Sequence, residues 1–119
     1  MSLDACLWTA YIEGCVYDWC IGRLEDVCKW QSFEADCVAD SVIRIDRALF
    51  GRMRLGSCLT ERFGQLGCVA DVRWLMERRC AGRHRCRVQL PDHQLDRSPH
   101  GCSPELAAYL EVEYHCQTG

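Results

Sequence analysis

Arginines are concentrated in one short stretch of this 119-residue chain. The planar guanidinium of arginine matches sulfate or carboxylate better than the ammonium of lysine does. The cluster consists of Arg78, Arg79, Arg83, Arg85 and Arg87, with Arg73 and His84 beside it. These residues predict a patch for a sulfated glycan such as heparan sulfate, or for an acidic protein surface. The plainer alternative is a solvated hairpin whose positive charge is diluted by Glu77.

The sequence gives little support for catalysis. His84, His93, His100 and His115 are scattered, with no serine–histidine–aspartate or paired-glutamate context around them. His115 alternates outward on a predicted strand, and Asp71, Asp92 and Asp96 look like turn or cap residues. We therefore expect a protein that is not an enzyme, with no catalytic residues, no cofactor and no metal site.

Cysteine is unusually frequent, with 11 among the 119 residues. This density is typical of small disulfide-stapled domains in oxidising compartments, so we expect a secreted protein or the extracellular part of a membrane protein. Two alternatives are a reduced cytosolic protein with buried thiols and a zinc protein. The spacing from Cys80 to Cys86 is too wide for a paired zinc knuckle.

The overall composition excludes several other classes of protein. Hydrophobic residues make up 49% and charged residues 26%, which is enough of each for a packed core and argues against disorder. No apolar run approaches the length of a membrane-spanning helix, and the net charge of -3 gives no general attraction to nucleic acid. Residues 1–6 do not resemble a secretory signal, so we expect the chain to be a piece of a longer precursor.

Alternating apolar and polar residues predict strands at 41–46, 86–90 and 110–116. On the last strand Leu110, Val112, Tyr114 and Cys116 share one face, and Glu111, Glu113 and His115 share the other. One main helix is predicted at about 71–80, with Asp71 as its cap. Pro91 should end the strand before it. The expected fold is α+β: a small, disulfide-stapled, mostly antiparallel domain resembling a β-sandwich.

Three stretches carry a resemblance to a known family. They are residues 42–52, ending in Phe-Gly-Arg; residues 77–88, with a Cys-x-Gly-x-x-x-Cys hairpin; and residues 109–116, Tyr-Leu-Glu-Val-Glu-Tyr-His-Cys. The chain from Cys28 to Cys116 resembles the galactose/rhamnose-binding lectin domain, also called sea-urchin-egg-lectin-like, found in fish-egg lectins and latrophilins. The resemblance implies a lectin-like domain at 28–119 and a cysteine-containing N-terminal extension at 1–27.

The same resemblance implies a disulfide pairing, which the sequence alone leaves open among 105 possibilities for eight cysteines. The implied bridges are Cys28–Cys58, Cys37–Cys116, Cys68–Cys102 and Cys80–Cys86. Cys6, Cys15 and Cys20 remain, an odd number, so one of them is free or joins another chain in a covalent dimer. A competing resemblance, of the segment 15–37 to the cysteine-rich module that follows von Willebrand type D domains, would place Cys28 and Cys37 in a helical fold.

Members of the lectin family grip the neighbouring hydroxyls of a sugar ring. The resemblance implies a glutamate after the first cysteine, a Tyr-Gly-Arg turn, and a lysine and backbone amides in the loop before the last strand. In this chain Lys29 replaces the glutamate, Phe50 the tyrosine and Ala108 the lysine, whereas Gly51 and Arg52 match. The loop is also one residue longer and contains Pro104. We therefore expect weak or absent binding of free galactose and rhamnose.

Lys29 and Glu105 lie in the two segments that would flank the pocket, so they could pair and close its mouth; two unrelated solvated charges are the alternative. Two functions remain open. The first is an extracellular recognition module for adhesion or receptor-type protein contacts, with a degenerate monosaccharide site. The second is a lectin for a divergent sugar, or for a sulfated glycan through the arginine-rich hairpin. The expected partner is an extracellular protein or glycan.

Overall fold

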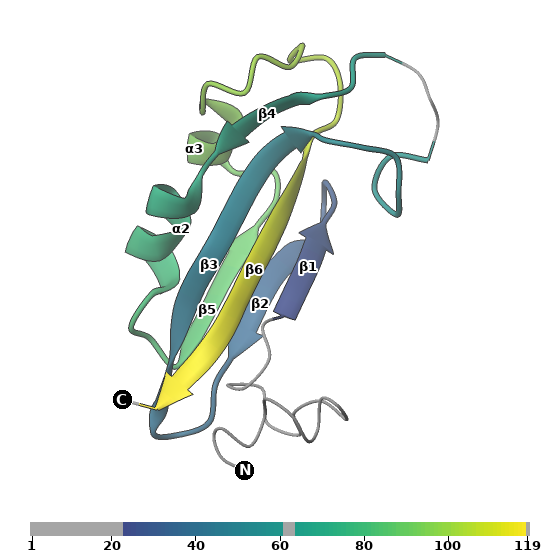
Figure 1. Ribbon diagram of the computed structural model, residues 1–119. Helices are drawn as coiled ribbons and strands as arrows, with labels where there is room; N and C mark the ends of the chain where they lie inside the picture. The colour runs from purple at the N-terminus through teal and green to yellow at the C-terminus, as the bar shows by residue number, and fades with distance from the viewer. Residues whose placement is uncertain (1–22, 61–63, 119) are drawn as a thin grey trace.

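The computed structural model describes residues 23–60 and 64–118, which form two antiparallel sheets (Figure 1). The larger sheet has the strand order β1-β6-β3-β4 and the smaller one pairs β2 with β5. The strands are β1 (Arg23–Val27), β2 (Ser32–Asp36), β3 (Ser41–Arg52), β4 (Cys68–Asp71), β5 (Arg85–Gln89) and β6 (Tyr109–Thr118). Figure 1 shows the β2–β5 pair behind β3 and β6. The predicted small, mostly antiparallel β domain is confirmed.

The core lies between the two sheets. Side chains alternate between buried and exposed along β2 and β5, as expected of strands with one covered face. Phe33 of β2 and Tyr114 of β6 meet edge to face, with ring centroids 5.4 Å apart. Ile43 of β3 and Val88 of β5 are buried in the same cluster. Removing one such large side chain from water contributes roughly 1.5–3 kcal/mol to folding, so this layer stabilises the scaffold that carries the loops.

Two short helices, α2 (Arg73–Cys80) and α3 (His93–Asp96), lie beside the sheets (Figure 1). The predicted helix at 71–80 is therefore present, but it begins two residues later because Asp71 is the last residue of β4. The Asp71 carboxylate still accepts a hydrogen bond from the backbone N–H of Arg73, at 3.0 Å. No helix in the described parts of the chain is long and apolar enough to cross a membrane.

The two faces of β6 differ less in burial than the alternation of apolar and polar residues suggests. Leu110, Val112, Tyr114 and Cys116 are buried as expected. Glu111, on the opposite face, is also buried and only 2% exposed. Arg47 and Arg54 place guanidinium groups on its carboxylate and cover it. Alternation along a strand predicts which side of the sheet a residue occupies, but not what lies above that side.

The structure contains the four bridges that the family resemblance implies: Cys28–Cys58, Cys37–Cys116, Cys68–Cys102 and Cys80–Cys86. The bridge to Cys116 closes a sequence separation of 79 residues and ties the end of β6 to the segment between β2 and β3. Cys28 and Cys37 thus flank a strand, which overturns the helical alternative.

The chain before residue 23, with Cys6, Cys15 and Cys20, lies outside the described residues. Residues Arg23–Val27 pair with β6 from Arg23–Tyr114 to Val27–Leu110, and so add an edge strand to the larger sheet. A domain boundary at residue 27 stays a prediction.

Candidate functional site

A cavity of about 620 Å³ lies where the β1–β2 turn meets the segments around residues 90 and 96–108. Its size falls in the range of ordinary ligand sites. Of the six predicted sugar-site positions, Lys29, Phe50 and Ala108 line the cavity, whereas Gly51, Arg52 and Glu105 do not. The full lining is Lys29, Trp30, Phe50, Leu90, Pro91, Asp96, Ser98, His100, Gly101, Cys102, Ser103, Pro104, Leu106, Ala107 and Ala108.

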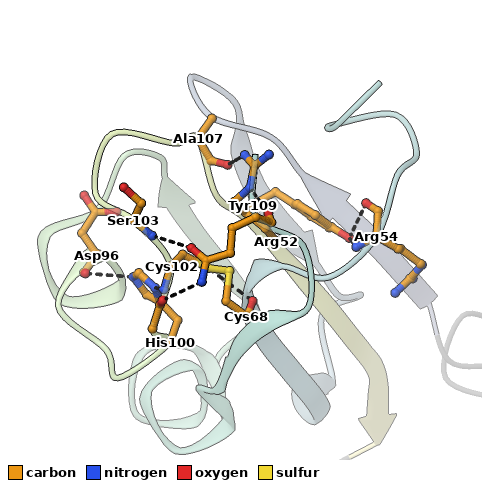
Figure 2. Close-up of a disulfide and its surroundings, with 11 residues drawn as sticks. Arg52, Arg54, Cys68, Asp96, His100, Cys102, Ser103, Ala107 and Tyr109 are labelled. Atoms are coloured by element: carbon orange, nitrogen blue, oxygen red, sulfur yellow. Dashed lines mark hydrogen bonds between the residues drawn. A yellow bond between two sulfur atoms is a disulfide. The ribbon is translucent and has the colours of Figure 1, made fainter. Parts of the chain in front are cut away.

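The segment 96–108 forms one side of the cavity, and some of its backbone N–H groups donate hydrogen bonds to other groups of the protein. The N–H of Cys102 donates to Nδ1 of His100 at 2.9 Å, and Nε2 of His100 lies 3.2 Å from the carbonyl oxygen of Asp96. The N–H of Ser103 donates to Oε1 of Gln65 at 3.0 Å. Figure 2 shows His100, Cys102 and Ser103 gathered beside the Cys68–Cys102 bridge. Two backbone amides of this loop are therefore already bonded within the protein.

Gly51 and Arg52 have structural tasks. A Cβ on Gly51 would lie 2.2 Å from the carbonyl oxygen of Cys68, so β4 can pass this closely only over glycine. Arg52 is buried, and its guanidinium donates to the carbonyl oxygens of Gln65 at 2.7 Å and Ala107 at 2.6 Å (Figure 2). Arg52 thus links the end of β3 to the segment at Gln65 and to the segment at Ala107. It does not line the cavity.

Phe50 forms part of the buried wall of the cavity. Its ring meets that of His100 with centroids 5.5 Å apart, and only 2% of Phe50 is exposed. No hydroxyl is present at this position to bond a sugar. A tyrosine lies nearby at Tyr109, but its hydroxyl accepts from the N–H of Arg54 at 3.2 Å (Figure 2). Burial raises the pKa of Tyr109, so the phenol stays neutral.

Lys29 and Trp30 form the turn at the other side of the cavity. The N–H of Gln31 donates to the carbonyl oxygen of Cys28 at 3.0 Å, and the N–H of Cys28 donates to Oε1 of Gln31 at 2.9 Å. The Lys29 ammonium lies 5.4 Å from the centroid of the Trp30 ring, which is a cation–π contact. Trp30 itself is 73% exposed and has a φ of 75°.

Of the two alternatives for Lys29 and Glu105, the ion pair is not formed among the described residues. Glu105 instead accepts a hydrogen bond from the hydroxyl of Ser103, at 3.1 Å. Lys29 is held over its neighbour Trp30. Trp30 is the lining residue that sequence reasoning missed most clearly, although its place directly after the predicted site position Lys29 was a signal.

Carboxylates offset much of the arginine-rich hairpin. Arg79 donates to both oxygens of Asp92, at 2.8 and 2.9 Å. Across the β2–β5 pair, Arg85 meets Asp36 at 3.3 Å and Arg87 meets Glu34 at 3.2 Å. These acids come from β2 and from the start of α3, so the stretch of arginines alone did not reveal them. Arg78, whose guanidinium lies 5.6 Å from the Trp74 ring centroid, and Arg83 are the members of the cluster that meet no carboxylate among the described residues.

The residues that the structure describes contain no group of three or more histidine, cysteine, aspartate or glutamate side chains able to hold a metal ion. The residues of the cavity wall that could exchange protons are few. His100 has both ring nitrogens engaged with backbone groups. Asp96 is an exposed residue at the end of α3. The volume and lining of the cavity are those of a ligand-binding site.

Comparison with known proteins agrees with this geometry. A family described as the D-galactoside/L-rhamnose binding SUEL lectin domain matches residues 35–116, which is more than half of the chain. A search of curated proteins found no match. The matched region covers β3, β4, β5, both helices, β6 as far as Cys116, and seven of the eight paired cysteines. The chain belongs to the SUEL lectin domain family, a family of non-enzymatic, disulfide-bonded carbohydrate-binding domains.

Proposed function

We propose that this domain is an extracellular recognition module of lectin fold, which mediates adhesion or receptor-type protein contacts and whose usual monosaccharide site is degenerate. Family membership implies glycan binding, and a disulfide-rich domain is consistent with an extracellular location. The proposal is carried by one observation: the loop amides at Cys102 and Ser103 bond within the protein.

The side chains of the cavity support the same proposal. Two neighbouring hydroxyls of a sugar need an acceptor for their protons and donors for their oxygens. Lys29 can only donate, Ala108 can do neither, and Phe50 has no hydroxyl. A site that leaves polar partners unmatched loses affinity by orders of magnitude. Free galactose and rhamnose should therefore bind weakly or not at all.

Isothermal titration of the domain with L-rhamnose and D-galactose tests the proposal. We expect no saturable heat at millimolar sugar, because Lys29 replaces the glutamate acceptor and the amides of Cys102 and Ser103 are already bonded within the protein. Lys29→Glu restores only the acceptor, and we expect it to remain inactive because the amides of Cys102 and Ser103 stay occupied. A micromolar isotherm of the unmodified domain with either sugar would overturn the degenerate site.

Family membership and the position of the cavity favour one second candidate, a lectin for a divergent glycan. A glycan array separates the two functions. Selective binding of one glycan class that is lost in Trp30→Ala supports the lectin, because Trp30 lines the cavity. Binding only to sulfated glycans that is lost when Arg78 and Arg83 are replaced assigns recognition to the hairpin instead.

The cysteine count bears on a covalent partner. Eight of the 11 cysteines form the four described bridges, which leaves three, Cys6, Cys15 and Cys20. Three thiols cannot all pair with one another, so we propose that one can join a second chain. Electrophoresis with and without reductant tests this: a band of twice the mass that disappears on reduction supports the dimer, and a monomer in both lanes contradicts it.

A further inference from the structure

Trp30 combines two properties that its own domain does not explain. It occupies the third position of the Cys28–Gln31 turn with a φ of 75°, a conformation for which glycine is preferred and a bulky side chain is unfavourable. Its side chain is nevertheless 73% exposed, so burial within the domain does not compensate for this backbone. Strained residues cluster where ligands are held, and tryptophan is a frequent anchor in interfaces. Trp30 is placed to contact something outside the domain.

The cavity beside Trp30 is suited to an apolar guest. Phe50, Leu90, Pro91 and Leu106 supply apolar surface to its wall. The hydroxyls in the wall are already engaged: that of Ser98 donates to the carbonyl oxygen of Leu95 at 2.6 Å, and that of Ser103 donates to Glu105. Both nitrogens of His100 are also bonded internally. A sugar ring would find few partners here, whereas an apolar side chain needs none.

One positive charge accompanies this apolar wall. Lys29 lines the cavity, and within the described chain no carboxylate pairs with its ammonium. The other lining residue with a formal charge is Asp96, at the end of α3. A carboxylate that approached Trp30 would meet the Lys29 ammonium beside the ring, and both residues are exposed to an incoming partner.

We propose that the cavity binds a segment of a partner protein in which a large apolar side chain is followed by an aspartate or glutamate. The apolar side chain contacts Trp30 and the wall near Phe50, and the carboxylate pairs with Lys29. This inference rests on the proposed function, because it names the chemistry of the protein partner for the same site.

Titration followed by ¹H–¹⁵N NMR tests the proposal on the whole chain. The indole N–H signal of Trp30 is assigned from its loss in Trp30→Phe. The probes are acetyl-Phe-Glu-amide and acetyl-Phe-Lys-amide. We expect the acidic probe to shift the Trp30 signal saturably and to bind about fivefold more tightly than the basic probe, as for a partly exposed ion pair. No saturable shift, or equal affinity for both probes, overturns the inference.

Four variants sharpen this test. Lys29→Glu should reverse the preference between the probes. Trp30→Gly should abolish binding while it relieves the turn and keeps the domain folded; because this variant has no indole at position 30, its binding is followed at the backbone N–H signals of Lys29, Gly101 and Ser103, which line the cavity. Asp96→Asn should leave binding of the acidic probe unchanged or tighten it, because it removes a like charge. Trp74→Ala is the matched control: Trp74 is also exposed, at 57%, but lies on α2 outside the cavity, so binding should persist. A loss in Trp74→Ala, or a weakening in Asp96→Asn, contradicts the assignment.

Methyl α-L-rhamnoside, added as a third probe, separates the two proposals. If neither peptide nor sugar shifts Trp30, the acidic partner segment is wrong and the degenerate monosaccharide site stands. If the rhamnoside shifts Trp30 saturably at micromolar concentration, the proposed function fails together with the inference that rests on it.

Discussion

Glu111 of β6 holds Arg54 by an ion pair of 2.8 Å between Oε1 and Nη2, although its own side chain is almost fully buried. Arg47 of β3 donates to the second carboxylate oxygen, also at 2.8 Å. The hydrogen bond and the charge of Glu111 raise the pKa of Arg54 above its ordinary value. Both arginines are about half exposed, so a buried anion is neutralised by cations that remain in water. The contacts of Glu111 with Arg47 and Arg54 connect the start of β6 to β3 and to the residues just after it, and so stabilise the sheet next to the loops.

Glu111→Gln should destabilise the domain by roughly 1–3 kcal/mol, because an uncharged amide cannot replace both charge-assisted contacts in a buried position. Urea unfolding at neutral pH measures the loss. Glu113→Gln is the matched control on the same strand, since Glu113 is 44% exposed and lies 3.5 Å from Arg47. It should cost less than about 1 kcal/mol. Equal losses in the two variants would show that the burial of Glu111 does not increase its contribution to the free energy of unfolding.

Asp92 should make stability depend on pH. Burial raises the pKa of its carboxyl, but hydrogen bonds from Arg79 and the N–H of Leu95, together with the charge of Arg79, more than offset this effect. The folded-state pKa therefore lies below the ordinary value of 3.8. A depressed pKa contributes stability above the ordinary value, and this contribution is lost as the pH falls through the folded-state pKa.

The variant Asp92→Asn isolates this contribution, because asparagine can still cap α3. We expect a loss of roughly 1–3 kcal/mol at pH 7 and a difference from the unmodified domain that shrinks as the pH falls below 3.8 and through the lowered pKa of Asp92. Thermal unfolding across this range provides the measurement. Asp36→Asn, in the exposed pair with Arg85, should show a far smaller effect at every pH. A difference for Asp92→Asn that is independent of pH would contradict the assignment.

The sequence predicted β3, β5, β6 and α2, because local patterns reveal these elements, but it did not reveal β1, β2, β4 or α3. The alternation in β6 and the periodicity of α2 are local signals, and the four bridges followed from family spacing. The site was harder to predict, because its chemistry depends on contacts across long separations. Gln65 meets Ser103 from 38 residues away, and Asp36 meets Arg85 from 49 residues away. No pattern within one segment reveals such partners.

Trp30→Gly should make the domain more stable. The φ of 75° at this position favours glycine, and relief of an unfavourable left-handed backbone is worth about 1 kcal/mol. The exposed ring loses little packing beyond its contact with Lys29. Chemical denaturation should therefore show a higher midpoint for Trp30→Gly than for the unmodified domain, with an unchanged slope. A lower midpoint would mean that the Trp30 ring stabilises the fold itself, which removes the argument that it is kept for a partner.

The ion pairs of the hairpin predict weak binding to heparin. Arg79, Arg85 and Arg87 already meet carboxylates, so Arg78 and Arg83 remain for sulfate groups. The unmodified domain should elute from a heparin column below about 0.2 M salt, where screening removes exposed contacts.

The double variant Glu34→Gln/Asp36→Asn releases Arg85 and Arg87 and should elute at higher salt. A second double variant, Arg78→Glu/Arg83→Glu, removes the two arginines that meet no carboxylate and should abolish retention on the column. If the first variant elutes with the unmodified domain, the acids on β2 do not limit the hairpin. If the unmodified domain is retained well above 0.2 M salt, the hairpin binds sulfated glycans despite its ion pairs. Glycan binding would then be favoured over protein binding as the function of this domain.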